Sequence, residues 1–240
     1  METLRGRAAN IVIGLGTALA IVALTLPLFL NPVWVAFEQG RSGAVAWTGF
    51  TEPELRAATD AILGDLVIGP PEFDVAVAGA PVLNERERGH MRDVRSVFIG
   101  FFAVTALLSA AALVIHARRR RGPERARSWG AARTGSLALI AALVSGGVLS
   151  VIAFDTVFEV FHRIFFAGGS YTFDPSTERL VQLFPFAFWQ ETALAVGAVC
   201  IVLAVLVAVV ANRRATATTT MSPAEDGAGA SSLPAPGPTR

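Results

Sequence analysis

The chain has 240 residues, 53% of which are hydrophobic, and its mean hydropathy of +0.54 is too apolar for an ordinary soluble domain. Its formal net charge at pH 7 is only +1, so no overall basic charge indicates nucleic acid as a partner. A single cysteine, Cys200, excludes an intrachain disulfide and a paired-cysteine metal or redox site. These values favour an integral membrane protein.

Four apolar stretches without acidic or basic residues are long enough to cross a bilayer, because about 20 apolar residues span its hydrocarbon core. They must be helices, since backbone groups in hydrocarbon have to be hydrogen-bonded within the segment itself. The sequence therefore predicts an all-α membrane protein whose four spanning helices are residues 8–37, 96–117, 134–154 and 192–212.

Arginine residues cluster before the first stretch, between the second and third, and after the fourth. All 20 basic residues of the chain are arginine, and positively charged loops generally stay in the cytoplasm. We therefore expect both termini inside the cell, together with a basic loop at 118–133. The tail at 213–240 is rich in Thr, Ala, Pro and Gly and is predicted to be disordered.

The remaining segments, 38–95 and 155–191, then lie on the outer face and form a small extracytoplasmic cap. Within the first, Thr51 and Glu54 have the spacing of a capping box, which starts a helix. Apolar residues then recur at helical spacing and give that helix one apolar face: Leu55, Ala58, Ile62 and Leu66. Residues 73–83 permit a short β-hairpin.

Two of the predicted spanning helices extend into this cap. Asn84 is placed to cap a helix over residues 85–116, so the second spanning helix begins outside the membrane. Residues 154–166 contain neither Gly nor Pro, and we expect the third spanning helix to continue past Asp155. An Asp-Pro pair predicts one further short helix at 175–183.

Two of the three histidines, His90 and His162, lie on these helices within about two turns of a spanning segment. Asp93 follows His90 at i+3, and Asp155 and Glu159 precede His162, so each imidazole can share a helix face with carboxylates. Phenylalanines form a stripe beside His162: Phe154, Phe158, Phe161 and Phe165. Burial disfavours an imidazolium and a carboxylate favours it, so we expect one histidine neutral and the other charged or proton-donating near pH 7, in either order.

The strings at 84–94 (NERERGHMRDV) and 154–166 (FDTVFEVFHRIFF) resemble the bacterial integral membrane family of lipoprotein intramolecular transacylases. The resemblance implies an acyltransferase, without cofactor or metal, in the bacterial cytoplasmic membrane. Its partners would be the bilayer and diacylglyceryl lipoproteins, whose sn-2 acyl chain moves to the amine of their own N-terminal cysteine, giving the lyso form. It also implies that His90 and His162 are the catalytic residues. Supporting residues would be Asp93, Asp155 and Glu85. Substrate-binding residues would be Phe154, Phe158, Phe161, Phe165 and Tyr171.

Other functions stay open on the residues alone. Both histidines can be structural and the phenylalanine stripe plain packing, because perturbed sites are only candidates. A zinc hydrolase would use the two histidines with Asp93 and Asp155, although no HExxH spacing is present. A non-enzymatic adaptor would bind a partner through the apolar face at 55–66. A transporter is disfavoured, because no spanning stretch has a charge near its middle.

Overall fold

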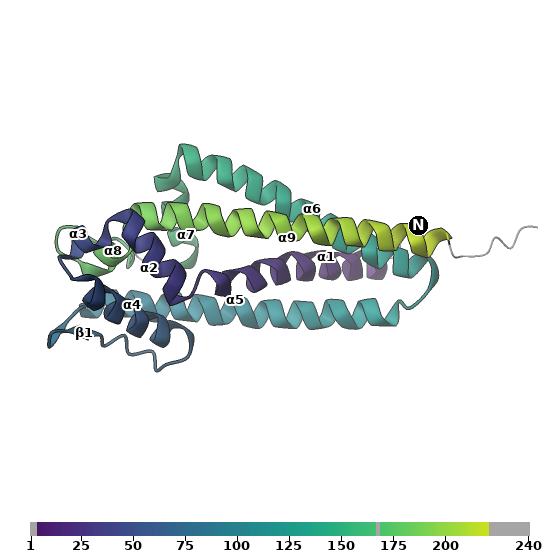
Figure 1. The fold of residues 1–240 in the computed structure, drawn as a ribbon. Coiled ribbons are helices and arrows are strands. Elements are labelled where there is room, and N and C mark those ends of the chain that lie inside the picture. The colour runs from purple at the N-terminus through teal and green to yellow at the C-terminus, as the bar shows by residue number, and fades with distance from the viewer. Residues whose placement is uncertain (1–3, 167–168, 221–240) are drawn as a thin grey trace, which may run out of the picture.

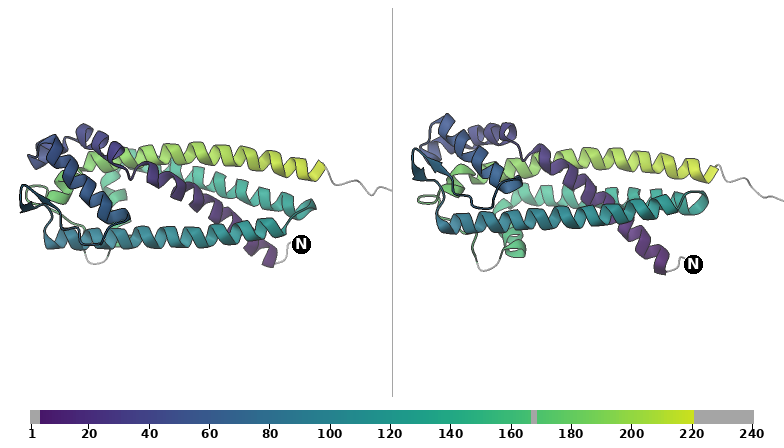
Figure 2. Two further views of the ribbon diagram at one scale, coloured as in Figure 1. Left: turned by 60° about the horizontal axis from the view of Figure 1, so that its bottom comes forward. Right: turned by 90° about the horizontal axis from the view of Figure 1, so that it is seen from below.

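The computed structural model describes residues 4–166 and 169–220, which form a long helical bundle with a folded head at one end (Figure 1). Four helices of the bundle are long and apolar enough to cross a membrane, which confirms the four predicted apolar helices. They are α1 (Leu4–Thr25), α5 (Glu85–Arg118), α6 (Gly122–Ile152) and α9 (Phe186–Thr220). Helix α1 runs obliquely across the other three and packs against each of them, whereas α6 packs along α9 (Figure 2).

The first apolar stretch differs from the single helix expected over 8–37. Helix α1 ends at Thr25, and a short 3-10 turn, η1 (Leu26–Leu28), separates it from α2 (Pro32–Ser42). Prolines at both ends of the gap explain the break, because proline lacks the amide hydrogen and clashes with the preceding helical turn. The side chain of Asn31 caps α2 by accepting hydrogen bonds from the amides of Val33 and Trp34. Helix α2 consequently belongs to the head.

Helix α6 differs from the expectation at both of its ends. It begins at Gly122, so most of the basic loop expected at 118–133 is helical, since Pro123 suits a first helical turn and no breaker follows it. At the other end α6 stops at Ile152, and Ala153, with φ −147° and ψ 52°, separates it from α7 (Phe154–Phe165). The third spanning helix therefore does not continue past Asp155. Helix α7 instead lies across the long axis of the bundle (Figure 1).

The head consists of α2, α3 (Ala44–Thr48), α4 (Glu52–Val67), a hairpin of β1 (Ala76–Val77) and β2 (Ala80–Pro81), α8 (Arg179–Leu183) and the first turns of α5. The predicted hairpin is confirmed but short. The predicted start of α4 is also confirmed: the amide and hydroxyl of Thr51 donate to Glu54 Oε2 at 2.9 and 2.7 Å. The apolar face of α4 packs into the head core, where Leu55 and Ile62 are buried. That face is therefore not free to bind an adaptor's partner.

The ends of the remaining helices follow from their caps. Asn84 caps α5 as predicted, accepting from the Glu87 amide at 2.9 Å. Asp174 caps only a turn, so the helix expected at 175–183 is reduced to α8. Helix α9 continues to Thr220 because no Gly or Pro occurs in residues 213–220, and the start of the predicted disordered tail is thus helical. The rest of that tail, 221–240, lies outside the described residues.

Candidate functional site

The two quoted strings, 84–94 and 154–166, meet where α7 packs beside the first turns of α5. The rings of His90 on α5 and His162 on α7 face each other with centroids 6.0 Å apart and an interplanar angle of 26°. Both side chains are buried, with 7% and 8% of their surface exposed. The turn at Ala153 makes this possible, since it directs α7 across the bundle toward α5. Two histidines that are 72 positions apart in the chain thus form one site.

Aromatic rings surround the histidine pair. Phe158 lies 4.0 Å and Tyr171 4.9 Å from the His162 ring, measured between centroids, and Phe161 lies 5.3 Å away. Phe166 contacts both histidine rings, and Phe173 lies 5.4 Å from His90. The phenylalanine stripe expected along α7 therefore contributes through its middle members, and the loop that follows α7 supplies the remaining rings.

Two members of the expected stripe lie farther from the imidazoles. Phe165 is half-exposed and its ring contact is with Phe161. Phe154 is buried against Phe186 and Phe158, one ring removed from His162. The sequence missed Phe166 and Phe173, because their contacts depend on how the chain turns after α7. The only available signal was their place in the chain, since Phe166 is the last residue of the quoted string 154–166 and Phe173 lies two residues after Tyr171.

The hydrogen bond of His162 fixes which nitrogen carries its proton. Nδ1 lies 2.7 Å from the carbonyl oxygen of Phe158, and a carbonyl can only accept a hydrogen bond. Nδ1 is therefore the donor, and in the neutral imidazole the lone pair is on Nε2. Nδ1 of His90, in contrast, is buried and has no hydrogen-bond partner among the described residues. The two rings are thus chemically different.

Both imidazoles are neutral near pH 7, and both lie outside the apolar spanning stretches. Burial, reinforced by the neighbouring His162, lowers the pKa of His90 to about 4 against the opposing charge of Asp93. Burial also lowers the pKa of His162, although the Phe158 carbonyl and Glu159 act in the opposite direction. Neither is therefore an imidazolium at rest, so a charged histidine is not supported. The other form of the expectation, one neutral base beside one proton donor, stays a prediction.

The carboxylates expected to orient the histidines do not contact them. Glu85 is exposed and pairs with Arg88 and Arg92 at 2.6 and 2.7 Å, and Asp155 is exposed at the start of α7. Asp93 is also exposed and acts on His90 only through space. Within the described residues no three His, Cys, Asp or Glu side chains converge as metal ligands, so the zinc hypothesis lacks a ligand set there.

Glu159 takes the place of these carboxylates at His162. It accepts hydrogen bonds from the Tyr171 hydroxyl at 3.1 Å and from Arg163 Nε at 2.8 Å. Its position three residues before His162 was visible in the sequence, but its contact with the loop was not. Glu159 therefore joins α7 to Tyr171 beside the imidazole.

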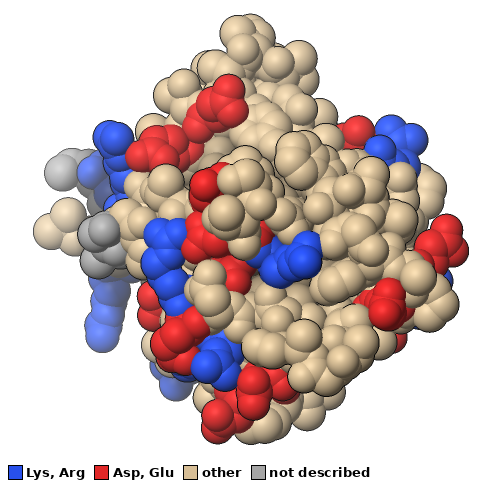
Figure 3. Space-filling model, turned by 90° about the vertical axis from the view of Figure 1, so that its left-hand side faces the viewer, with Lys and Arg blue, Asp and Glu red and all other residues tan. Residues whose placement is uncertain are grey.

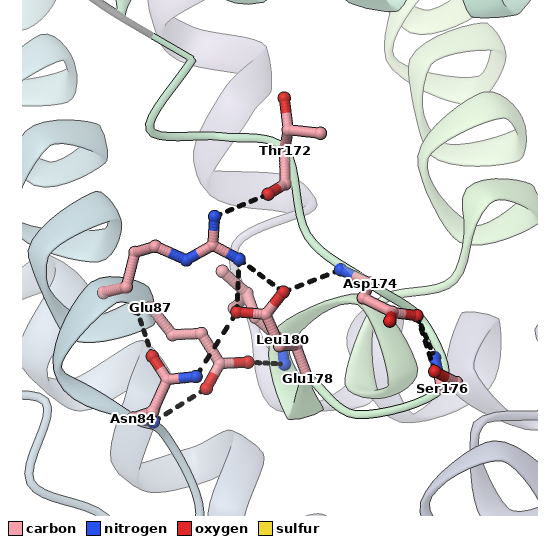
Figure 4. A network of polar contacts seen from close by, with 8 residues as sticks. Asn84, Glu87, Thr172, Asp174, Ser176, Glu178 and Leu180 are labelled. Carbon is pink, nitrogen blue, oxygen red and sulfur yellow. Dashed lines mark hydrogen bonds and ion pairs between the residues drawn. The ribbon is translucent and has the colours of Figure 1, made fainter.

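A polar network around the buried Glu178 fixes the loop that carries Tyr171 and Phe173 against α5 (Figure 4). Arg86 Nη2 lies 2.5 Å from both carboxylate oxygens of Glu178, and Arg86 Nη1 donates to the Thr172 carbonyl at 2.9 Å. The Arg86 guanidinium also lies 4.8 Å from the centre of the Phe173 ring. Burial alone would raise the pKa of Glu178, but hydrogen bonds from Arg86, the Asp174 amide and Asn84 lower it. The network keeps the aromatic loop over His90.

Glu87 connects the same loop to the helix cap of α5. Its Oε1 accepts from the Leu180 amide at 2.6 Å, and its Oε2 accepts from the Asn84 amide at 2.7 Å. Only 1% of the Glu87 side chain is exposed. The sequence predicted Glu87 as a capping residue, and its second role, which joins α8 to α5, depends on tertiary packing.

An apolar groove of about 660 Å³ lies between α6 and α9 and reaches the start of α7. Glycines 146, 147 and 197 line it and leave it open, because a Cβ atom at any of them would meet only empty space. Val157 also lines the groove, and the next residue, Phe158, contacts His162. The groove therefore reaches α7 at the residue next to one that contacts His162.

Comparison with known proteins identifies the family. The family model described as lipoprotein intramolecular transacylase Lit matches residues 12–189. The structure of Lit from Bacillus cereus superimposes with a TM-score of 0.69 at 17% identity, covering 89% of this chain and 97% of that one. The same protein with a histidine-to-alanine mutation gives a TM-score of 0.66 at 17% identity, over 89% and 94%. No functionally curated protein matches the sequence.

Proposed function

Because the chain belongs to the lipoprotein intramolecular transacylase Lit family, an enzyme family of acyltransferases, we propose that it transfers an acyl chain within a diacylglyceryl lipoprotein. The acyl group would leave the sn-2 glyceryl oxygen and join the amine of the lipoprotein's own N-terminal cysteine. The observation that supports this most strongly is the buried pair of neutral imidazoles, His90 and His162, inside an aromatic pocket.

In the proposed reaction His162 acts as the general base. The cysteine amine attacks the ester carbonyl carbon, and Nε2 of His162 takes the proton that the nitrogen loses as the new C–N bond forms. The hydrogen bond from Nδ1 to Phe158 supports this role, since it leaves the lone pair on Nε2. Glu159 stabilises the imidazolium that forms, because its negative charge favours protonation of His162.

His90 acts as the hydrogen-bond donor to the tetrahedral intermediate. A neutral imidazole has one N–H group, which can be directed at the oxyanion that develops from the ester carbonyl. When the intermediate collapses, the bond to the sn-2 oxygen breaks, and His162 returns its proton to that oxygen. The proton taken from the amine thus ends on the glyceryl hydroxyl, and no external acyl donor, oxidant or metal ion takes part.

The membrane setting brings the two reacting groups together. The protein is membrane-integral, with four apolar helices. We propose that the arginine-rich end faces the bacterial cytoplasm and the head faces outward, in agreement with the distribution of positive charge. The groove between α6 and α9 would hold an acyl chain, so that its ester carbonyl lies next to α7. Much of the rate gain would then come from proximity.

The proposal is tested with purified enzyme and a synthetic diacylglyceryl lipopeptide. The product has the same mass as the substrate, so tandem mass spectrometry must locate the acyl chain on the amine. His90→Phe and His162→Phe keep the ring packing but remove the nitrogens, and each should slow conversion by about 100-fold or more. The matched control is His116→Phe, since His116 contacts Trp129 on α6 and not the histidine pair. Conversion at the unmutated rate by both site variants would contradict the proposal.

A further inference from the structure

Among the described residues, the arginines at the end of the bundle opposite the head form no ion pairs with acids. Every ion pair within residues 4–166 and 169–220 is formed by an arginine of the head or of α7. These arginines are Arg41, Arg86, Arg88 and Arg92 in the head and Arg163 on α7. At the opposite end arginines flank α1, α5, α6 and α9, and Glu124 is the only acid among the described residues there. These positive charges must be balanced from outside the described chain.

A groove of about 1150 Å³ between α1 and α6 opens at this arginine-rich end. Arg119, Arg127 and Arg133 line its polar part, together with Asn10 and Glu124. Arg119 is held in position, because its Nη1 donates to Asn10 Oδ1 at 2.6 Å and lies 3.4 Å from Ser128 Oγ. Neither Arg127 nor Arg133 forms an ion pair within the described part of the chain. The groove thus has one fixed guanidinium and two exposed ones.

The rest of the groove is mainly apolar. On α1 its lining extends from Gly6 to Val22, which corresponds to about 24 Å along a helix at 1.5 Å per residue. On α6 it includes Ala138 and Leu139. A single leaflet contributes about 15 Å of hydrocarbon, half of the total core, so the groove is long enough for one lipid chain below its headgroup.

The groove also has a fixed width at one point. Helices α1 and α6 approach so closely at Gly14 and Gly135 that a Cβ atom on Gly135 would collide with the Gly14 backbone. This contact holds the two helices at a set distance, and the groove lies alongside it. The arginines and the apolar wall therefore keep their relative positions.

We propose that this groove binds one anionic phospholipid. The phosphate would be held by Arg119, Arg127 and Arg133, since guanidinium groups bind phosphate through paired hydrogen bonds. One acyl chain would lie along the small side chains of α1 and α6. Charge complementarity selects an anionic headgroup, and the apolar length of the groove selects a lipid over a free phosphate ion. The site is separate from the histidine pair and does not depend on the proposed reaction.

Native mass spectrometry of the full chain in detergent tests the proposal with an equimolar mixture of phosphatidylglycerol and phosphatidylcholine. The protein should retain one phosphatidylglycerol in preference to phosphatidylcholine. The double variant Arg127→Gln/Arg133→Gln should weaken that binding by about tenfold or more, because each arginine at a lipid surface contributes measurably to anion binding. The control Arg120→Gln/Arg121→Gln loses the same charge at residues that do not line the groove and should bind as the unmutated protein does.

Two further arms separate the possible sources of the signal. Ala138→Phe fills the groove and keeps every arginine, so it should abolish retention of the lipid, whereas Ala110→Phe on the exposed face of α5 should not. Inorganic phosphate in excess should not displace the lipid. Equal weakening by the two double-arginine variants would overturn the proposal in favour of diffuse surface charge. Displacement by phosphate, or unchanged retention in Ala138→Phe, would overturn the acyl-chain part of the site.

Discussion

The two ends of the bundle differ in whether their arginines form ion pairs. At the head end acidic and basic side chains lie next to each other (Figure 3), and several form short ion pairs, including that between Arg86 and Glu178. At the other end arginines stand with almost no acids among the described residues. The head pairs several of its arginines with acids, and one of these pairs holds the aromatic loop over the histidines. The arginine-rich end leaves its charge for the membrane surface.

The contrast between the two ends supports placing the proposed reaction site in the head. A buried imidazole stays neutral only where fixed neighbours exclude water, and the network of Arg86, Glu87 and Glu178 supplies that fixed structure. The unpaired arginines could not do so, because they are largely exposed. We therefore expect the stability of the head and the chemistry at the histidines to be linked. Mutations in the head should change stability and activity, whereas mutations at the arginine-rich end should change lipid binding.

The largest expected effect on stability is that of Glu87→Ala. It leaves the buried amide of Leu180 and the part-buried amide of Asn84 without their partner, which should lower the free energy of unfolding by about 2–4 kcal/mol. Thermal unfolding in detergent would measure the loss. Glu85→Ala is the matched control, two residues away, since Glu85 is exposed and its removal should change Tm only slightly. Equal losses in both variants would show that the buried network does not hold the head together.

A smaller effect is expected from pH. The pKa of His90 is about 4 in the folded protein and near 6.5 when the chain is unfolded, so the unfolded state binds more protons between these values. Stability should therefore fall as pH decreases from about 6.5 toward 4, with a slope of at most about 1.4 kcal/mol per pH unit from this residue. His90→Phe should remove that part of the slope, which Tm at pH 7 and pH 5 would measure in parallel with the unmutated protein. An identical slope in both would mean that His90 is not buried in neutral form.

Local signals predicted much of this molecule from the sequence. The apolar stretches, the capping boxes at Thr51 and Asn84 and the helical positions of His90 and His162 all depend on residues close together in the chain. These were sufficient to place both histidines at one end of the bundle.

What could not be predicted depends on contacts between distant segments. No Gly or Pro marks the turn at Ala153, which arises where the amphipathic α7 leaves α6 and packs across the bundle. Likewise, Asp155 and Glu159 were both plausible partners of His162 by spacing. Only Glu159 is held beside that ring by tertiary structure, because the loop after α7 brings the Tyr171 hydroxyl to it. The pairing of Glu178 with Arg86 joins residues 92 positions apart.

The most direct test of the proposed acyl transfer is a crossover experiment with two lipopeptides of different sequence. One has a deuterated chain at the sn-2 position, the other has an unlabelled chain, and both are incubated together with the enzyme. The proposed reaction predicts that each N-acylated product keeps its own chain. Deuterium should therefore stay on the first peptide and should not appear on the second. Deuterated chain on the amine of the second peptide would show transfer between molecules and would contradict an intramolecular reaction at the His90–His162 pair.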